Sequence, residues 1–256
     1  MWLDFLLLLV ASVAAFEGGL ALASRLAAQR RAEGDDSDGH TLSGVFGLLA
    51  LLLAFSFGLA LDRYEERRDL VVAEATALST LSSRLALLQP ADEATVRSLL
   101  GEYAVARLAF GEAATDDTAA EAFELAEAIM ARAGDAIYAA LESTPPDTRG
   151  PVLLQPFNEA GDVAAMRLAA REAHLPDAVM VLLCVFIIAG AGMLGYNRAG
   201  QPRVHRPAVL VFLVLLAIAF ITVLDLDRPR SGVIQVPQAA MEREAAALIA
   251  VANNEG

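Results

Sequence analysis

The residues best suited to chemistry in this sequence lie in two charged runs, each of which directly follows an apolar run. The first, DRYEERR, covers residues 62–68. On a helix Asp62 and Glu66 lie four residues apart, as do Tyr64 and Arg68, so acids and bases form rows. We interpret this run either as a solvated helix with weak surface ion pairs, or as a charged ring at a pore mouth if copies of the helix surround an axis.

The second charged run, DLDRPRSG, covers residues 225–232. An Arg beside two carboxylates at the edge of a membrane can form bidentate pairs, and Pro229 stops the preceding helix. The run therefore predicts a structural cluster that joins the last apolar run to the helix carrying Glu65 and Arg68. An ion-binding site is the alternative.

A single carboxylate, Glu17, interrupts the first apolar run. An ionised carboxylate within a membrane is costly unless it finds a partner or water. Two interpretations stay open, in which Glu17 either lines an ion path and carries a proton or holds helices together. If Glu17 is buried, we expect Arg198 or His205 as its partner.

No motif in the sequence supports catalysis. The three His residues, at positions 40, 174 and 205, have no metal-ligand spacing, and the only Cys, Cys184, lies in an apolar run. No nucleophile elbow, phosphate-binding glycine loop, H-E-x-x-H or C-x-x-C motif occurs. We therefore predict that the protein is not an enzyme and has no metal site and no cofactor.

Four apolar runs must position these residues, and each is long enough to cross a membrane. Of the 256 residues 56% are hydrophobic, which is too apolar for an ordinary soluble domain. We place the spans at about residues 1–28, 41–61, 176–196 and 208–224. A signal peptide is the alternative for the first run, but the lack of positive charge at its beginning favours a retained span.

Span two continues into a long helix. No Pro and no Gly lies between Leu59 and Leu88, so one helix from residue 41 to residue 89 is the simplest interpretation. At 1.5 Å per residue this helix is about 70 Å long, of which about 30 Å lies in lipid. The rest of the chain must pack around it.

The segment between spans two and three is predicted to be helical throughout. After the long helix, we expect helices at about 92–113, 117–141 and 152–174, with a break at residues 143–147. Short links between helices of this length favour an antiparallel bundle. The apolar positions are Val96, Leu99, Leu100, Tyr103 and Leu108 in the second helix and Phe123, Leu125, Ile129 and Ile137 in the third.

The predicted fold is therefore all-α, an integral membrane protein with four transmembrane helices and a membrane-proximal helical bundle inserted between spans two and three. We predict boundaries at 1–61 (spans one and two), 62–174 (bundle), 175–226 (spans three and four) and 227–256 (C-terminal tail). By the positive-inside rule, Arg residues in the two short loops place the bundle outside. The Arg residues beside spans two and four favour the opposite side, so the sidedness stays open.

Small residues recur within the spans, and aromatic residues accompany them in span two. Small residues let membrane helices approach closely, either within one chain or between copies of it. The stripes are Ala11, Ala15 and Gly19; Ser43, Gly47, Ala50, Ala54 and Gly58; and Gly190, Gly192 and Gly195. Because hydrophobic constrictions gate pores by dewetting, the candidates to line or gate a pore are Phe46, Phe55, Ser56 and Phe57.

The negative net charge of the chain argues against nucleic acid as a partner. The chain has 32 acidic and 19 basic residues, all of the latter Arg, and a net charge of −13. An acidic surface repels phosphate backbones, so we expect no nucleic-acid binding.

The segment AFSFGLALDRYEERRDLVVAEATAL (residues 54–78), together with DLDRPRSG, resembles the bestrophin-like domain family of bacterial membrane proteins. A His before span two and the layout of four spans with a helical insert match as well, so the resemblance covers nearly the whole chain. The family motif maps onto His40, Asp62, Glu65, Arg68, Glu74, Asp225, Asp227, Arg228, Pro229 and Gly232. More distantly, the chain is similar to true bestrophins, which are pentameric anion channels, so the resemblance implies anion conduction and a cytoplasmic bundle.

These observations predict an oligomeric ion channel or pore that the long helix lines. The alternative is a membrane-anchored sensor or interaction module whose bundle binds a ligand or a partner. We expect the lipid bilayer, further copies of the chain and a small inorganic ion as partners. The expected location is the cell membrane, as a multi-pass protein, and the resemblance implies a bacterial inner membrane.

Overall fold

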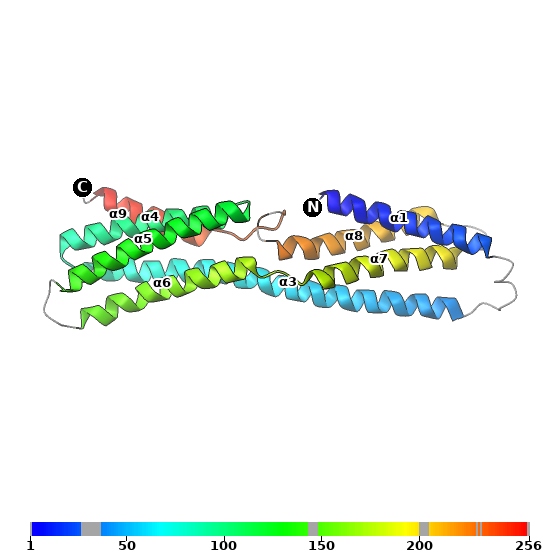
Figure 1. Cartoon of the computed structure of the whole chain (residues 1–256), viewed down its shortest axis with the longest axis horizontal. Coiled ribbons are helices and arrows are strands. Elements are labelled where there is room, and N and C mark those ends of the chain that lie inside the picture. The colour runs from blue at the N-terminus through cyan, green and yellow to red at the C-terminus, as the bar shows by residue number, and fades with distance from the viewer. Residues whose placement is uncertain are drawn as a thin grey trace. The chain divides into compact units, whose positions relative to one another are not determined.

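The chain is helical and contains no strand in the part that the computed structural model describes, which is residues 2–26, 37–142, 148–199, 205–228, 230 and 232–254. This agrees with the predicted all-α fold. The helices (Figure 1) are α1 (Trp2–Arg25), α3 (Ser37–Arg84), the short 3₁₀ helix η1 (Leu85–Leu87), α4 (Pro90–Glu112), α5 (Asp116–Glu142), α6 (Arg149–Glu172), α7 (Asp177–Arg198), α8 (Arg206–Asp227) and α9 (Ala239–Asn254). The predicted break at residues 143–147 lies outside the described residues.

Four helical stretches are long and apolar enough to cross a membrane. They are Trp2–Arg25, His40–Leu87, Arg149–Arg198 and Arg206–Asp227. Large apolar side chains on α1, α7 and α8 are exposed, including Leu6, Val10, Val181, Val185, Leu210 and Leu215. Apolar side chains exposed along such helices face lipid, so the protein is an integral membrane protein.

Helix α3 is a single helix of 48 residues. It is shorter at its end than predicted, because the α-helix stops at Arg84, η1 tightens the next turn, and Leu88 is extended with a ψ of 169°. Gln89 is extended as well, with a ψ of 149°. The cause is Pro90, whose ring disfavours helical backbone in the preceding residue and then suits the first turn of α4.

The chain forms two compact units. Unit 1 comprises Met1–Arg63 and His174–Val233, and unit 2 comprises Tyr64–Ala173 and Ile234–Gly256. Unit 1 therefore holds α1, α7, α8 and the first part of α3. Unit 2 holds the remainder of α3, the helices α4 to α6, and α9.

In unit 1, small residues set the distance between α1 and α7, which lie side by side (Figure 1). A side chain at Gly19 would overlap the backbone of Gly192, and one at Gly195 would overlap the backbone of Phe16. The small residues of spans one and three therefore pack within the chain. Around this contact, the core of unit 1 includes Leu8, Phe16, Leu49, Leu183, Ile187, Leu213 and Phe220.

The core of unit 2 joins α3, α4, α5, α6 and α9. It includes Leu78, Leu81, Val96, Leu100, Tyr103, Ile129, Ile137 and Leu153. Most of the apolar positions predicted for the second and third helices are buried here. Leu108 and Phe123 are only partly buried, and Leu125 is 56% exposed because it lies outside the α5 face that includes Ala126 and Ile129.

The segment that we predicted as a C-terminal tail contains α9, which packs on α4. Met241, Ala245 and Leu248 recur at three- and four-residue spacing and are all buried. Helix α9 packs over Gly101 of α4, where a Cβ would lie at the ordinary contact distance of 3.9 Å from Leu248. The C-terminal helix is thus part of the core of unit 2.

Candidate functional site

The predicted pore-lining residues of α3 lie on different sides of the helix. Phe46 packs edge-to-face on Phe212 of α8, with ring centroids 5.2 Å apart, and Ser56 is buried. Phe55 is 65% exposed and Phe57 is 42% exposed, but two helical positions turn their side chains about 200° apart. Phe46 and Ser56 therefore pack within the chain. Phe55 and Phe57 are exposed and can contact lipid, water or another copy of the chain.

One side of α3 in unit 1, which we call the open face, consists of exposed residues at helical spacing. Two glycines lie at its start, large apolar side chains follow them, and a carboxylate ends it. Its members are Gly44, Gly47, Leu48, Leu51, Phe55, Leu59 and Asp62. No other side chain or backbone of the described chain lies within 4 Å of a Cβ built at Gly44 or Gly47. In contrast with Gly19 and Gly195, these two glycines have no packing partner in the described chain.

The charged run after the open face contains both exposed and buried residues. Asp62, Glu65 and Arg68 are exposed, and so is His40 near the start of α3. Arg67 instead is buried in unit 2, where its Nε donates to the carbonyl of Ala170 at 2.9 Å and its Nη2 to that of Ala173 at 2.7 Å. A cation suits these carbonyls because they end helix α6. The run is therefore part solvated helix and part structural anchor.

The second charged run folds around two buried carboxylates of unit 1. Asp225 accepts hydrogen bonds from the backbone N–H of Val233 at 3.0 and 3.1 Å, and Asp227 accepts one from the N–H of Leu175 at 2.8 Å. A side chain at Gly232 would overlap the carboxylate of Asp225, so only Gly fits there. Asp227 thus ties the end of α8 to the segment that leads into α7.

The remaining motif residues of this run, Arg228 and Pro229, add fewer contacts to the structure. Arg228 lies 3.7 Å from the carboxylate of Asp4 in α1, and both side chains are partly exposed. Pro229 lies outside the described residues. Among the residues that the structure describes, no group of three or more His, Cys, Asp or Glu could hold a metal ion. The arrangement favours the structural interpretation of this run over the ion site.

We expected Arg198 or His205 as the partner of Glu17 only if Glu17 is buried, and it is exposed instead. Its carboxylate lies 3.1 Å from Nη2 of Arg206, at the start of α8. The side chain of Glu17 is 46% exposed, and that of Arg206 is 68% exposed. Glu17 is therefore not in a buried interior, and Arg206 compensates its charge.

A cluster of charged residues is buried within unit 2, at the motif residue Glu74. Glu74 of α3 and Arg107 of α4 are both 0% exposed. Arg107 binds the carboxylate with two hydrogen bonds, from Nε to Oε1 at 2.6 Å and from Nη2 to Oε2 at 3.1 Å. Nη1 of Arg167 in α6 donates to Oε2 at 2.5 Å, and the hydroxyl of Tyr103 donates to Oε1 at 2.7 Å. One carboxylate thus connects three helices.

The charges of this cluster stabilise one another in a medium of low dielectric constant. Burial alone would raise the pKa of Glu74, but the charges of Arg167 and Arg107 and their hydrogen bonds hold it below its ordinary value. Burial and the charge of Glu74 raise the pKa of Tyr103 well above its usual range, so its phenol stays a donor. Nη2 of Arg167 also donates to Oε1 of Gln238, at 3.1 Å, which links the chain before α9 to the cluster.

The family motif contains Glu74, but it does not contain the partners of Glu74, which are Tyr103, Arg107 and Arg167. Arg107 follows Tyr103 by four residues and Leu100 by seven, so it lies on the apolar side of its helix. A charged residue in such a position requires a buried partner, and this signal could have identified Arg107. No spacing in the sequence connects Glu74 with Arg167, which is 93 residues away.

The fold and these sites together define an all-helical integral membrane protein with a buried ionic cluster in its second unit. The chain belongs to the Bestrophin-like domain family, whose model matches residues 9–241. That range contains every motif residue predicted from the resemblance. No curated protein matches the chain.

Solved structures show the same fold. The crystal structure of a bacterial bestrophin homologue from Klebsiella pneumoniae is 17% identical, with a TM-score of 0.73, and the match covers 98% of this chain and 98% of that chain. A mutant form of the homologue is 18% identical, with a TM-score of 0.71 and coverage of 96% and 98%. At this identity the likeness shows the fold, which confirms the predicted arrangement of four spans with a helical insert.

Proposed function

We propose that this protein is an oligomeric ion channel in which the open face of α3 lines the pore. The open face itself carries the proposal. The exposed faces of α7 and α8 bear mostly large apolar side chains, which suit lipid, whereas the open face of α3 has two unpacked glycines and ends in a carboxylate that needs water or a partner. Copies of the chain around an axis would cover this face and keep Asp62 in contact with water.

The chemistry of the open face suits a gated path. Gly44 and Gly47 leave space beside the backbone, while Leu51 and Phe55 narrow it. A ring of such apolar side chains would exclude water until it widens, which is gating by dewetting. Membership of the Bestrophin-like domain family supports the same function, and we place the protein in the cell membrane as a multi-pass protein.

Ion flux from liposomes tests the proposal. Phe55→Ala should widen the constriction and raise the flux about tenfold or more, whereas Leu215→Ala, at a lipid-facing position of α8, should leave it unchanged. Native mass spectrometry of the same preparations should show a closed ring of several copies. A monomer that conducts no ion in liposomes would contradict the proposal.

Whether the channel conducts anions or cations is addressed by two opposing observations. The likeness to bestrophins favours anion conduction. Asp62 favours cations, because a ring of carboxylates at a pore end attracts them. The reversal potential of the purified protein in a potassium chloride gradient distinguishes the two outcomes.

A ligand-responsive membrane module is the second candidate function, and one observation favours it. Unit 2 contains a cavity of about 220 Å³ beside Arg107 and Tyr103. Ligand binding with no conduction under any condition would favour the module over the channel. A conducting protein whose flux responds to the ligand would combine the two.

A further inference from the structure

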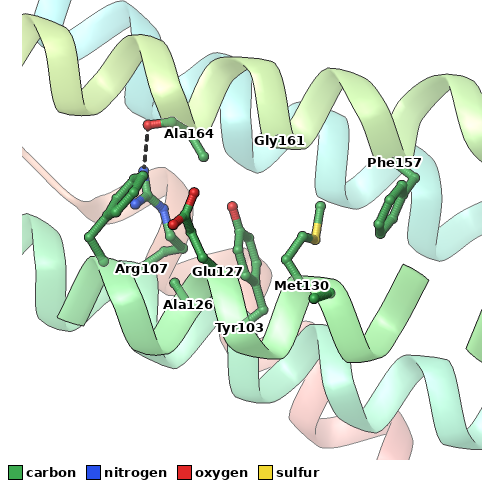
Figure 2. A pocket seen from close by; sticks show the side chains of 10 residues that line it. Tyr103, Arg107, Ala126, Glu127, Met130, Phe157, Gly161 and Ala164 are labelled. Atoms are coloured by element: carbon green, nitrogen blue, oxygen red, sulfur yellow. Dashed lines mark hydrogen bonds between the residues drawn. The ribbon is translucent and has the colours of Figure 1, made fainter. Parts of the chain in front are cut away.

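The cavity of unit 2 lies beside the Glu74 cluster, between helices α4, α5 and α6 (Figure 2). Its volume is about 220 Å³, and its walls include Tyr103, Arg107, Phe123, Met130, Phe157 and Gly161. In Figure 2, Arg107 lies on one side of Tyr103, and Met130 and Phe157 lie on the other. The cavity wall is therefore mostly apolar, with the guanidinium of Arg107 and the exposed carboxylate of Glu127 as its charged groups.

The guanidinium of Arg107 has one nitrogen without a hydrogen-bond acceptor. Its Nε and Nη2 bind Glu74, and Nη2 also contacts the carbonyl of Ala164 at 3.4 Å (Figure 2). Its Nη1 is buried and has no acceptor anywhere in the described chain. Phe110 and Phe123 stack on the guanidinium, with its carbon 4.5 and 5.3 Å from the ring centroids, but stacked rings accept no N–H in the guanidinium plane.

The cluster also carries more positive than negative charge. Within the described residues, Glu74 is the one carboxylate that binds the guanidiniums of Arg107 and Arg167. Buried charges are stable when they are paired, so an anion that reaches the buried Nη1 of Arg107 would be stabilised there. The hydroxyl of Tyr103 donates to Glu74 and leaves its oxygen free to accept.

We propose that this cavity binds a small organic carboxylate with an apolar body, whose carboxylate accepts a hydrogen bond from Nη1 of Arg107. An apolar cavity of about 150 Å³ accommodates a benzene ring, so the larger volume here suits a ring or a short alkyl chain with one carboxylate. This inference does not rest on ion conduction. It assigns a ligand class to the bundle, which no motif of the sequence indicates.

Glu127 on the wall of the cavity provides a test of whether the ligand is an anion or a cation. It is exposed, and its carboxylate would repel an anionic ligand but attract a cationic one. Glu127→Gln should therefore tighten the binding of a carboxylate about twofold, as expected for the loss of one exposed like charge. Weaker binding in this variant would overturn the assignment of an anion.

The experiment uses the full chain in detergent, with benzoate as the probe and benzamide as its neutral isostere. Isothermal titration should show saturable binding of benzoate in the millimolar range or tighter, and binding of benzamide at least about tenfold weaker. Equal binding of the two compounds, no binding of benzoate up to about 10 mM, or equal heats from sodium chloride would each overturn the proposal.

A pair of variants on α6 shows whether the probe occupies this cavity. Gly161 lines the cavity and a Cβ there meets nothing within 4 Å, so Gly161→Leu should place its side chain in the cavity. It should weaken benzoate binding by about tenfold or more, whereas Ala165→Leu, at an exposed position of the same helix, should leave it unchanged. Unchanged benzoate binding in a folded Gly161→Leu protein would place the ligand elsewhere and overturn the inference.

Discussion

At the scale of the residue, Glu74 is the side chain on which unit 2 most depends. It accepts hydrogen bonds from Tyr103, Arg107 and Arg167, which come from two other helices. A buried carboxylate with this many charged donors is satisfied, but its removal leaves two buried guanidiniums without a counterion. The family motif at this position thus has a structural explanation.

Replacement of Glu74 by Ala should lower the free energy of unfolding by about 3–5 kcal/mol, because breaking a buried ion pair leaves uncompensated charge. Thermal unfolding in detergent, followed by circular dichroism, measures the change. Glu65→Ala is the matched control on the same helix, since Glu65 is exposed and its loss should change the free energy by less than about 0.5 kcal/mol. Equal effects of the two substitutions would contradict the structural role of Glu74.

The lowered pKa of Glu74 predicts a dependence of stability on pH. The folded pKa lies below the unfolded value of about 4.3, so the stabilisation is complete above that value and is lost as the pH falls through the folded pKa. The melting temperature of the native protein should therefore fall on acidification below about pH 4.5. In Glu74→Gln this fall should be smaller, and an identical pH profile for the two proteins would contradict the prediction.

At the scale of the element, small residues have two different uses. In α1 and α7 they let two backbones touch inside unit 1, at Gly19 and Gly195. In α3, Gly44 and Gly47 lie open. In α1 and α7 the small residues therefore mark a helix contact within the chain. In α3, according to our proposal, small residues mark the lining of a pore.

Two neighbouring glycines of α1 allow a matched test of this difference. Gly19→Ala should destabilise unit 1 by about 1–3 kcal/mol, because its Cβ would overlap the backbone of Gly192. Gly18→Ala meets open space and should stabilise the helix by up to about 1 kcal/mol. Melting temperatures of the two variants in detergent measure both effects, and changes of the same sign would be inconsistent with the α1–α7 contact.

At the scale of the whole molecule, each unit has its own core, and the unit with the spans carries the proposed path. The net charge of −13 makes the protein surface outside the spans attractive to cations and repulsive to anions. Asp62, at the end of the open face, would be repeated in every copy of an oligomer. The contribution of this single residue to ion selectivity should therefore multiply with the number of copies.

Asp62→Asn should shift the reversal potential in a potassium chloride gradient toward the chloride value, because it removes a ring of negative charge from the pore end. Planar-bilayer recordings measure the shift. Asp162→Asn, at an exposed position of α6, changes the net charge equally and should leave the reversal potential in place. A shift of the same size in both variants would indicate general surface charge instead of a ring at the pore.

The sequence by itself determined the four spans, the all-helical fold and the continuous helix α3. These follow from local properties, namely runs of apolar residues, helical periodicity and the positions of Pro and Gly, which act over a few turns of chain. The family motif also contains Glu74, Asp225, Asp227 and Gly232, although it does not specify their contacts. Even the early end of α3 has a local cause, in Pro90.

The contacts between residues that are far apart in the sequence follow only from the tertiary structure. It joined Glu74 to Arg167 across 93 residues, paired Glu17 with Arg206, buried Ser56 while exposing Phe55, and packed α9 into the core of unit 2. Contacts of this kind depend on how amphipathic helices pack, and one helical periodicity is compatible with many partners. The physical reason is that burial couples residues far apart in the chain, so a charged side chain on an apolar face shows that it has a partner but does not identify it.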